Sequence, residues 1–558
     1  MLKFFSEHTR LKSILLCLLS GTLLGLSFPP FQTWFLVYPG LLVFLYLLFS
    51  SNRLRQTFGR CYLALFFFNE ITLYWISGWH SSDTFLKLGG IASVLLHPFF
   101  MMLPVVFVYG VYKAFNKHTA LFSFPFVWVG FEYFDNMWQF SFPWLELGNT
   151  ETYNLYRIQH IEYIGVHGLT FIICLITVLI YFTASRIYNK QWQHFGVKTF
   201  SLVTLVLIFL LFPNYYSSVR LSDSNNEKYY YTSDSTKIIK ACIAQTNTDP
   251  YEKWGPAQDS LIDTYIAKLN EGLKFNADLM LLHETAPAYY FLEDYNYPKT
   301  VKFFNFVNAN KKCLLMGIPH LEYYADSNTA PNDARFSKTS GRKYDAFNSA
   351  ILIEPNKRKE DLTIHKKVKL VPFSERVPYQ DIFPFAEKLV NWGVGISHWQ
   401  KGTELKLFEL NNPAFKPRAK FETMICYESV FSEYVSTGVK NGAEFIAIVT
   451  NDGWWGNTAG PYQHEQYAVL RAIENRKWIV RCAQTGVSCY IDPLGNIYDE
   501  MPYYSEGVTS RDIIANSEIT FYAQNGDIIG RLGFYIFLAS LGVSLISYAY
   551  MKILKRKA

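Results

Sequence analysis

Charged residues are scarce in this chain of 558 residues, and one long stretch has none. Asp, Glu, Lys and Arg make up 18% of the sequence, whereas a soluble globular domain carries about 25%. Positions 13–52 are 40 consecutive residues without any of the four, and the net charge of the whole chain is only +6. These shortages exclude a purely soluble protein, a disordered protein and a nucleic-acid binder that works through bulk positive charge.

The apolar residues instead gather in segments long enough to cross a bilayer. A helix needs about 20 apolar residues to span ~30 Å of hydrocarbon. The uncharged stretch holds two such segments, which a proline-containing turn at 28–31 separates. Six further segments have a similar composition: 61–79, 88–112, 119–136, 163–185, 199–213 and 532–551. The sequence therefore predicts a polytopic α-helical membrane bundle with eight spans.

Lysine and arginine are distributed unevenly over the loops between these segments. They lie before the first segment, after the second, fourth and sixth, and after the last, whereas the alternate short loops contain only Lys87 and Arg157. By the positive-inside rule, both chain ends are expected in the cytoplasm. With eight crossings, residues 214–530 are then expected outside the cytoplasm.

Between residues 238 and 517 the pattern changes to strands and helices in alternation. We predict strands at 238–245, 278–283, 313–319, 347–354, 421–426, 445–450, 478–482 and 488–491. We predict helices at 257–273, 301–310, 429–440 and 463–475. The alternation is typical of an α/β domain with buried sheets. The polar stretch 222–235 is predicted to be a linker and residues 324–342 a surface loop.

The chain is therefore divided into four parts. Residues 1–220 form a membrane domain with seven spans, and 221–237 form a linker. Residues 238–517 form the extramembrane α/β domain, and 528–558 form the eighth span with a basic tail. Three ionisable residues fall at membrane depth: Glu70, His97 and His167. Such residues are functional candidates by default, but these form no recognisable cluster in the sequence, so we interpret each as facing the bundle interior.

Disulfide and metal patterns are absent from the sequence. Five of the eight cysteines fall in the extramembrane part, an odd number, so at least one of them is unpaired. There is no CxxC pair and no HExxH motif, which leaves a disulfide framework or a structural zinc site unsupported. An unpaired cysteine outside the cytoplasm is prone to oxidation unless it is sheltered. A catalytic role for one of them is therefore an attractive interpretation.

Three segments place reactive side chains at the ends of predicted strands. Segment 279–287 brings a carboxylate, Glu284, to the end of a strand. In segment 364–378, three lysines precede a predicted Pro-Phe-x-Glu turn. In segment 424–428, Cys426 lies at the end of a predicted strand and at the start of a predicted helix. At a helix N-terminus, unpaired amides favour a thiolate. A base, an ammonium and a thiol fit nucleophilic acyl transfer, although the residue types alone also fit structural roles.

In this order, the three segments resemble the Glu-Lys-Cys signature of the nitrilase superfamily. Together with the eight spans, the chain resembles the apolipoprotein N-acyltransferases over nearly its whole length. Further segments carry this resemblance: 142–145, 370–375, 450–457, 460–464 and 471–475. The resemblance implies that the extramembrane domain is a nitrilase-type αββα sandwich.

The resemblance also implies roles for individual residues. Glu284 would be the general base, Lys367 the oxyanion lysine and Cys426 the nucleophile. Supporting or substrate-binding residues would be Trp254, Glu375, Tyr427 and Glu428. For Trp254 and Tyr427, aromatic core packing fits equally well. The chain has Leu-His-Glu where the family commonly has Trp-Pro-Glu. Lys366 and Lys369 lie close to Lys367, which is assigned as the oxyanion lysine because its spacing to Val-Pro-Phe matches the family best.

The implied reaction has two steps and needs no cofactor, metal or nucleotide. The cysteine would take an acyl chain from a phospholipid, and the N-terminal amine of a diacylglyceryl-cysteine lipoprotein would then take it from the thioester. The implied enzyme is a monomer among membrane lipids and does not bind nucleic acid. It is a multi-pass protein of the inner membrane with its catalytic domain in the periplasm and both termini in the cytoplasm.

Three alternatives remain open from the sequence. A membrane-tethered nitrilase-type amidase would use the same three residues on a small amide. A polytopic acyltransferase would use an intramembrane histidine such as His97. A transporter or receptor would use the extramembrane domain as a sensor.

Overall fold

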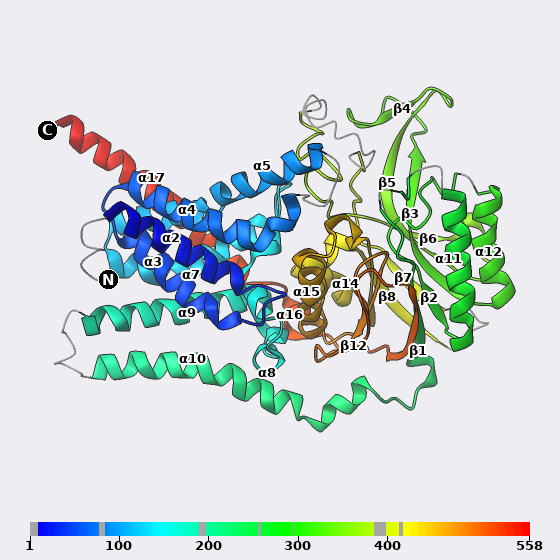
Figure 1. Ribbon diagram of the computed structural model, residues 1–558, viewed down its shortest axis with the longest axis horizontal. Helices are drawn as coiled ribbons and strands as arrows, with labels where there is room; N and C mark the ends of the chain where they lie inside the picture. Colours follow the sequence, from blue (N-terminus) through cyan, green and yellow to red (C-terminus); the bar gives the residue numbers. More distant parts are fainter. Residues whose placement is uncertain are drawn as a thin grey trace. The chain divides into compact units, whose positions relative to one another are not determined.

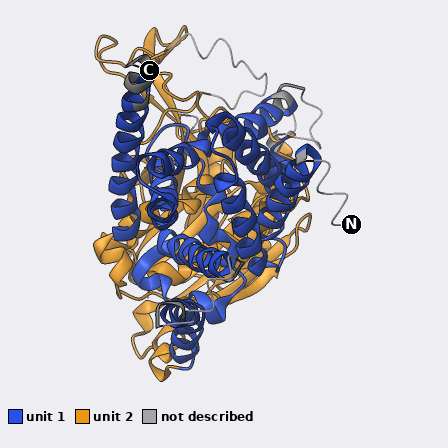
Figure 2. Cartoon of the chain, turned by 90° about the vertical axis from the view of Figure 1, so that its left-hand side faces the viewer, with its two compact units in different colours: residues 1–222, 527–558 blue, residues 223–526 orange. Residues whose placement is uncertain are grey.

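The computed structural model describes residues 9–77, 84–188, 197–250, 252–254, 258–293, 295–383, 398–411 and 417–557. The chain forms two compact units, coloured separately in Figure 2. Residues 1–222 and 527–558 form what we call the helical unit, and residues 223–526 form the α/β unit. The last helix of the chain therefore belongs with the first two hundred residues and not with the domain that precedes it.

Helices, most of them long and apolar, build the helical unit (Figure 1). They are α2 (Thr9–Leu26), α3 (Val37–Phe49), α4 (Leu54–Leu73), α5 (Thr84–Phe100), α6 (Met102–Ala114), α7 (Lys117–Asp135), α8 (Leu155–Ile158), α9 (Ile161–Tyr188), α10 (Val197–Leu221) and α17 (Ile528–Lys557). Each predicted span contains one of these helices, except that α5 and α6 share the fourth. Among the described residues, four helical stretches are long and apolar enough to cross a membrane: 89–114, 161–186, 200–221 and 528–550. The count of eight crossings thus stays a prediction.

Close contact between α7 and α17 depends on two glycines. A Cβ added to Gly130 would lie 2.2 Å from the carbonyl oxygen of Gly533, far inside any real carbon–oxygen contact. In a bilayer, close van der Waals packing between helices replaces the hydrophobic effect, and small residues permit it. The two glycines therefore explain how a helix at the end of the chain packs against one from its first quarter.

Two sheets form the α/β unit. The first contains β1 (Ile238–Gln245), β2 (Leu279–Leu281), β3 (Cys313–Tyr323), β4 (Arg335–Ser337), β5 (Arg342–Ile353), β6 (Thr363–Lys366) and β13 (Gly507–Ile514). Its order is β13-β1-β2-β3-β5-β4, and β6 pairs with β5. The second contains β7 (Leu407–Leu410), β8 (Ala419–Ile425), β9 (Phe445–Thr450), β10 (Ile479–Ala483), β11 (Ser488–Ile491) and β12 (Ile497–Met501), in the order β12-β11-β10-β9-β8-β7.

Helices cover the outer faces of the two sheets. Figure 1 shows α11 (Gln258–Gly272) and α12 (Pro298–Asn310) on one side, and α14 (Ser432–Lys440) and α15 (Ala459–Asn475) on the other. One apolar core combines side chains of both sheets, such as Ile243 and Phe421, and a second combines the first sheet with α11 and α12. The parallel strands β8, β9 and β10 are almost entirely buried, as covered parallel strands are. The unit is the αββα sandwich that the sequence predicts.

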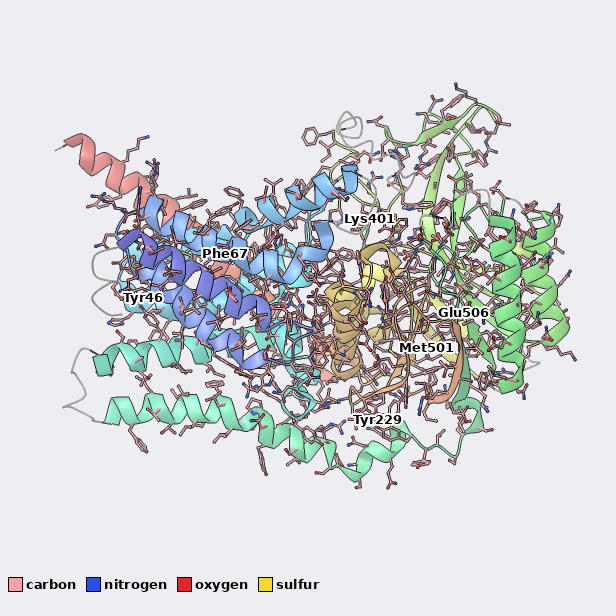
Figure 3. The ribbon with its side chains drawn as sticks, in the orientation of Figure 1. Tyr46, Phe67, Tyr229, Lys401, Met501 and Glu506 are labelled. Atoms are coloured by element: carbon pink, nitrogen blue, oxygen red, sulfur yellow. The ribbon has the colours of Figure 1, made fainter. Side chains whose placement is uncertain are left out.

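The sequence did not predict every element of this sandwich. β4, which has three residues, lies inside the predicted surface loop 324–342 and pairs with β5. β6, β7, β12 and β13 were not predicted either, because they are short or carry polar side chains towards solvent. The stretch 222–235 contains a short 3₁₀ helix (Ser224–Tyr229), and Tyr229, labelled in Figure 3, is fully buried. This stretch therefore packs on the α/β unit.

Candidate active site

A buried cluster joins two carboxylates to one lysine. Glu284 lies in the turn that follows β2, and Lys367 comes directly after β6. The Nζ of Lys367 donates to Oε1 of Glu284 at 3.1 Å and to Oε1 of Glu375 at 2.9 Å. Asn348, on β5, donates from Nδ2 to the same two oxygens at 2.7 and 2.9 Å. All four residues are at most 6% exposed, so the cluster is almost closed to solvent.

The electrostatics of this cluster keep its lysine charged. Burial lowers the pKa of Lys367, but the carboxylates of Glu284 and Glu375, with a smaller contribution from Cys426, raise it by more, so the net pKa lies above its ordinary value. Glu375 is itself fixed, because its Oε2 accepts the amide of Val371 at 2.9 Å. The cluster therefore presents a permanent, oriented ammonium.

Cys426 stands at the end of β8 with an unusual backbone conformation. Its φ is +50°, in the left-handed region that non-glycine residues seldom occupy and that often marks functional sites. Its side chain is 6% exposed. The charges of Glu284 and Lys367 both influence the pKa of this thiol.

The expectation that a helix N-terminus would favour the Cys426 thiolate is wrong for this structure. The residue begins a five-residue 3₁₀ helix (Cys426–Val430) and not a full α-helix. Burial is the largest influence and raises the thiol pKa, and the charge of Glu284 raises it further, while Lys367 and a hydrogen bond from Thr450 lower it by less. Burial thus favours the thiol of Cys426 over its thiolate, so a base would be needed to make it reactive.

Glu428 accepts hydrogen bonds both from the segment next to Lys367 and from the segment next to Cys426. Its Oε1 accepts the amide of Val368 at 2.6 Å, and its Oε2 accepts the amide of Ile425 at 2.9 Å. His365 Nε2 lies 3.1 Å from Oε2. Burial raises the pKa of Glu428, but the charge of His365 and these hydrogen bonds lower it by more, so the net pKa is below 4.5. One ionised carboxylate therefore positions the residues next to both reactive groups.

A second buried network supports the backbone of Cys426. His464 Nδ1 lies 2.9 Å from Oδ1 of Asp452, and its Nε2 lies 3.1 Å from the carbonyl oxygen of Cys426 and 2.9 Å from Oγ of Ser429. Arg481 donates to Oδ2 of Asp452 at 2.8 Å. Burial raises the Asp452 pKa, but Arg481 and His464 lower it by more, to about 2. The network thus supports the backbone at Cys426, where φ is positive.

This network also contains the residue types of a metal site. Within the described residues, potential ligand atoms of Cys426, Asp452 and His464 lie within 4.8 Å of one another. Both imidazole nitrogens already have protein partners, and the carboxylate is paired with a guanidinium. The arrangement fits the support of a nucleophile better than it fits a cation.

Comparison with known proteins identifies the family. The model of the apolipoprotein N-acyltransferase N-terminal domain matches residues 20–179, and that of the carbon-nitrogen hydrolases matches residues 240–520. An apolipoprotein N-acyltransferase of Chlorobaculum tepidum is 32% identical over 530 residues, which cover 93% of this chain and 94% of that protein. The chain belongs to the apolipoprotein N-acyltransferase family. A relative from Geobacter metallireducens is 28% identical over 531 residues, covering 93% of this chain and 92% of its own.

Comparison with solved structures finds members of the nitrilase superfamily at low similarity. Nit3 of Saccharomyces cerevisiae, a nitrilase-superfamily member, is 17% identical with a TM-score of 0.35, covering 50% of this chain and 90% of its own. An amidase from Nesterenkonia is 13% identical with a TM-score of 0.33, covering 51% of this chain and 93% of its own. The match to the carbon-nitrogen hydrolase model, over residues 240–520, shows that the sandwich of this apolipoprotein N-acyltransferase family member has the nitrilase-superfamily fold.

The three neighbouring lysines of this N-acyltransferase family member have different surroundings. Lys367 contacts the two carboxylates, whereas Lys366 donates to Glu322 at 2.6 Å. The Nζ of Lys369 lies 4.6 Å from the centre of the Phe431 ring. The structure therefore brings Lys367, and not the other two, to Glu284.

The two predicted aromatic residues also differ in environment. Trp254 is 37% exposed and helps to line a cavity of about 140 Å³, together with Tyr289, Tyr290 and Trp399. Tyr427 is 2% exposed, and its ring centre lies 5.2 Å from that of Phe431, edge to face. Trp254 is available to a ligand, whereas Tyr427 is packed in the core.

Sequence reasoning missed several contributors to this site. Asn348 and Lys253 carry no motif that singles them out. His464 and Asp452 fall within two segments that carry the family resemblance, which was the available signal. In the helical unit, His167 is buried, as expected for a residue that faces the bundle interior, and it has partners that the sequence did not reveal: its Nδ1 lies 2.5 Å from Asp527 and its Nε2 3.2 Å from Glu146. His97 contacts Asn69 at 2.7 Å.

Proposed function

We propose that this chain is an apolipoprotein N-acyltransferase whose chemistry is carried out by Glu284, Lys367 and Cys426. The observation that carries the proposal is the contact of one buried lysine with two carboxylates beside a buried thiol, in a chain that belongs to this family over nearly its full length. The proposed donor is a phospholipid, and the proposed acceptor is a lipoprotein with an N-terminal diacylglyceryl-cysteine.

The first step forms a thioester. Glu284 takes the thiol proton, and the sulfur attacks the ester carbonyl carbon of the phospholipid. The Lys367 ammonium stabilises the negative charge that develops on the carbonyl oxygen. The intermediate collapses, the carbon–oxygen ester bond breaks, and the leaving alkoxide takes the proton from Glu284. A lysophospholipid departs, and the acyl chain remains on Cys426.

The second step forms an amide. The α-amine of the lipoprotein attacks the thioester carbon, and Glu284 takes one proton of the amine. The carbon–sulfur bond then breaks, and the thiolate recovers a proton from Glu284. Lys367 also donates to Glu375, so its ammonium keeps a second hydrogen-bond acceptor at the moments when Glu284 carries the proton. This gives the second carboxylate a role beside the base.

The architecture suits two substrates that are both embedded in lipid. We propose eight spans, with both termini in the cytoplasm and residues 238–517 on the periplasmic side of the inner membrane. We further propose that the enzyme acts as a monomer. A catalytic domain tethered to the membrane meets lipid substrates at a high effective concentration. This arrangement fits lipid-to-lipoprotein transfer better than it fits hydrolysis of a small soluble amide.

Mass labelling tests the proposal. The purified enzyme is incubated with a phospholipid that carries a tagged acyl chain, without acceptor, and should accumulate a hydroxylamine-labile acyl group on Cys426. Adding a diacylglyceryl-cysteine peptide should convert the label to an amide. Cys489→Ala, which removes another buried cysteine, is the matched control and should label normally, whereas Cys426→Ala should not. Full N-acylation by Cys426→Ala would favour a membrane histidine instead, and turnover of small amides without a lipid thioester would favour the amidase.

A further inference from the structure

A second lysine lies buried beside the general base. Lys253 is 1% exposed and sits in a turn between β1 and α11. Its Nζ donates to the carbonyl oxygen of Glu284 at 2.9 Å, to Oγ1 of Thr285 at 2.8 Å and to Oε1 of Gln484 at 2.8 Å. An ammonium has three protons, and these three acceptors satisfy all of them.

The environment of Lys253 is costly for a structural lysine. None of its three acceptors is a carboxylate, although a buried charge ordinarily needs an ionic partner. Burial lowers the pKa of Lys253 to about 7, and the charge of Glu284 opposes that shift. An uncharged side chain of similar length would fill the same space at a lower desolvation cost. The ammonium therefore needs an explanation beyond packing.

The turn that Lys253 holds is strained and tightly packed. Thr285 has a φ of +45°, a conformation that is a genuine outlier for a β-branched residue. On the side of β3, a Cβ added to Gly317 would lie 2.5 Å from the Thr285 amide nitrogen and 2.6 Å from the Glu284 Cα. The backbone that carries the base is thus held between β3 and the Lys253 ammonium.

The third acceptor connects the base to the nucleophile side of the site. Gln484 follows β10 in the second sheet, and its amide nitrogen donates to the carbonyl oxygen of Thr450 at 3.0 Å. The hydroxyl of Thr450 in turn interacts with Cys426. Lys253 therefore links the turn that carries Glu284, in the first sheet, to the segment that contacts Cys426, in the second.

We infer that Lys253 is a positioning residue for acyl transfer: its ammonium fixes the backbone of Glu284 relative to Cys426 and places a positive charge near the carboxylate. The inference rests on the proposed function, because it assigns Glu284 the role of base. Lys253 touches no reacting atom and acts through the residue that it holds.

A matched control lies elsewhere in the same unit. Lys477 is also fully buried, burial also lowers its pKa to about 7, and its Nζ donates to Asn516 and to the carbonyl oxygen of Glu518. These bonds lie outside the acid cluster and the Cys426 network. Lys253→Met and Lys477→Met therefore remove the same kind of buried ammonium, but only the first removes it from the base.

Two rates are measured for each full-length variant: formation of the acyl-enzyme, and alkylation of Cys426 by iodoacetamide as a function of pH. Lys253→Met should slow acylation about 10²-fold, the usual effect of a misplaced catalytic group. It should also move the acid limb of both pH profiles to higher pH, since the carboxylate loses a nearby cation. Lys477→Met should lower the melting temperature without moving either limb.

Lys253→Arg keeps the charge and covers the case in which Lys253→Met does not fold. It should hold the acid limb at the wild-type position even where the rate falls. The inference would be overturned if the acid limbs of Lys253→Met stayed at their wild-type pH, or moved only as far as those of Lys477→Met. It would also be overturned if the acid limb of Lys253→Arg moved to higher pH. Failure of the wild type to form any acyl-enzyme would instead overturn the proposed function. The alkylation profiles need no lipid and still report on Lys253.

Discussion

Removing the Lys367 ammonium should disable the site in two ways at once. Glu284 and Glu375 accept hydrogen bonds from the same two nitrogens, so their Oε1 atoms lie close together. Two like charges roughly 5 Å apart, at an effective dielectric constant near 20, repel by about 3 kcal/mol. In Lys367→Met the ammonium no longer offsets that repulsion, so the positioning of the base is disturbed and the oxyanion donor is lost.

The two losses set the expected magnitude. An oxyanion donor contributes about 3–4 kcal/mol to the transition state, and a general base contributes about 10²–10⁴-fold in rate. Acyl-enzyme formation by Lys367→Met should therefore fall by about 10³-fold or more. The assay is a quenched single turnover with tagged phospholipid, in which hydroxylamine-labile label on Cys426 is counted against time.

The neighbouring lysines are the controls for this prediction. Lys366 forms a partly exposed ion pair with Glu322, and Lys369 lies over an aromatic ring. Each contact is worth about 1 kcal/mol or less, so Lys366→Met and Lys369→Met should each lose less than about fivefold. The reasoning is refuted if either of these is the inactive variant while Lys367→Met still forms the thioester.

Three further predictions follow from the same contacts. Glu428→Gln should lower the melting temperature at neutral pH. The folded pKa of Glu428 lies below its ordinary value of 4.5, so the carboxylate stabilises the fold above that pH, and this stabilisation is lost as pH falls through the folded pKa. The difference in melting temperature from wild type should therefore shrink in acid, and a difference that does not depend on pH would contradict this cause. His464→Ala should slow acylation without altering acceptor affinity, measured as separate kcat and KM values, and a change in KM alone would contradict a role in holding Cys426. A cysteine introduced as Ser340→Cys, at an exposed position, should react with an impermeant thiol reagent from the periplasmic side, and labelling from the cytoplasmic side alone would invert the proposed topology.

The parts of the fold that can be predicted are the buried strands, because burial leaves a run of apolar residues in the sequence. The strands β1, β9 and β11 were predicted with the bounds that the structure has, because each is a short, continuous run of buried residues between polar segments. β4 and β12 carry exposed or half-exposed side chains, so no apolar run marks them. Their position is set by pairing with a neighbouring strand, which local sequence does not encode.

The same distinction separates the site residues. Glu284 and Cys426 could be proposed because each stands where an apolar strand ends. The network partners could not, since Asn348 acts across strands and Lys253 acts between the two sheets. His167 and Asp527 are 360 positions apart, so their contact exists only in the folded helical unit. The state of Cys426 was also mispredicted, because sequence shows a helix start but not the burial that outweighs it.

That burial has a consequence for an enzyme proposed to work outside the cytoplasm. All eight cysteines, each within the described part of the chain, are free and buried. Oxidation follows thiolate character and exposure, and the Cys426 thiol has little of either at rest. In the proposed mechanism, Cys426 therefore stays protonated until Glu284 takes the proton. The Lys367 ammonium would stabilise both the proposed thiolate and the resulting oxyanion, so one buried charge would favour reaction with an ester while the resting thiol stays protected.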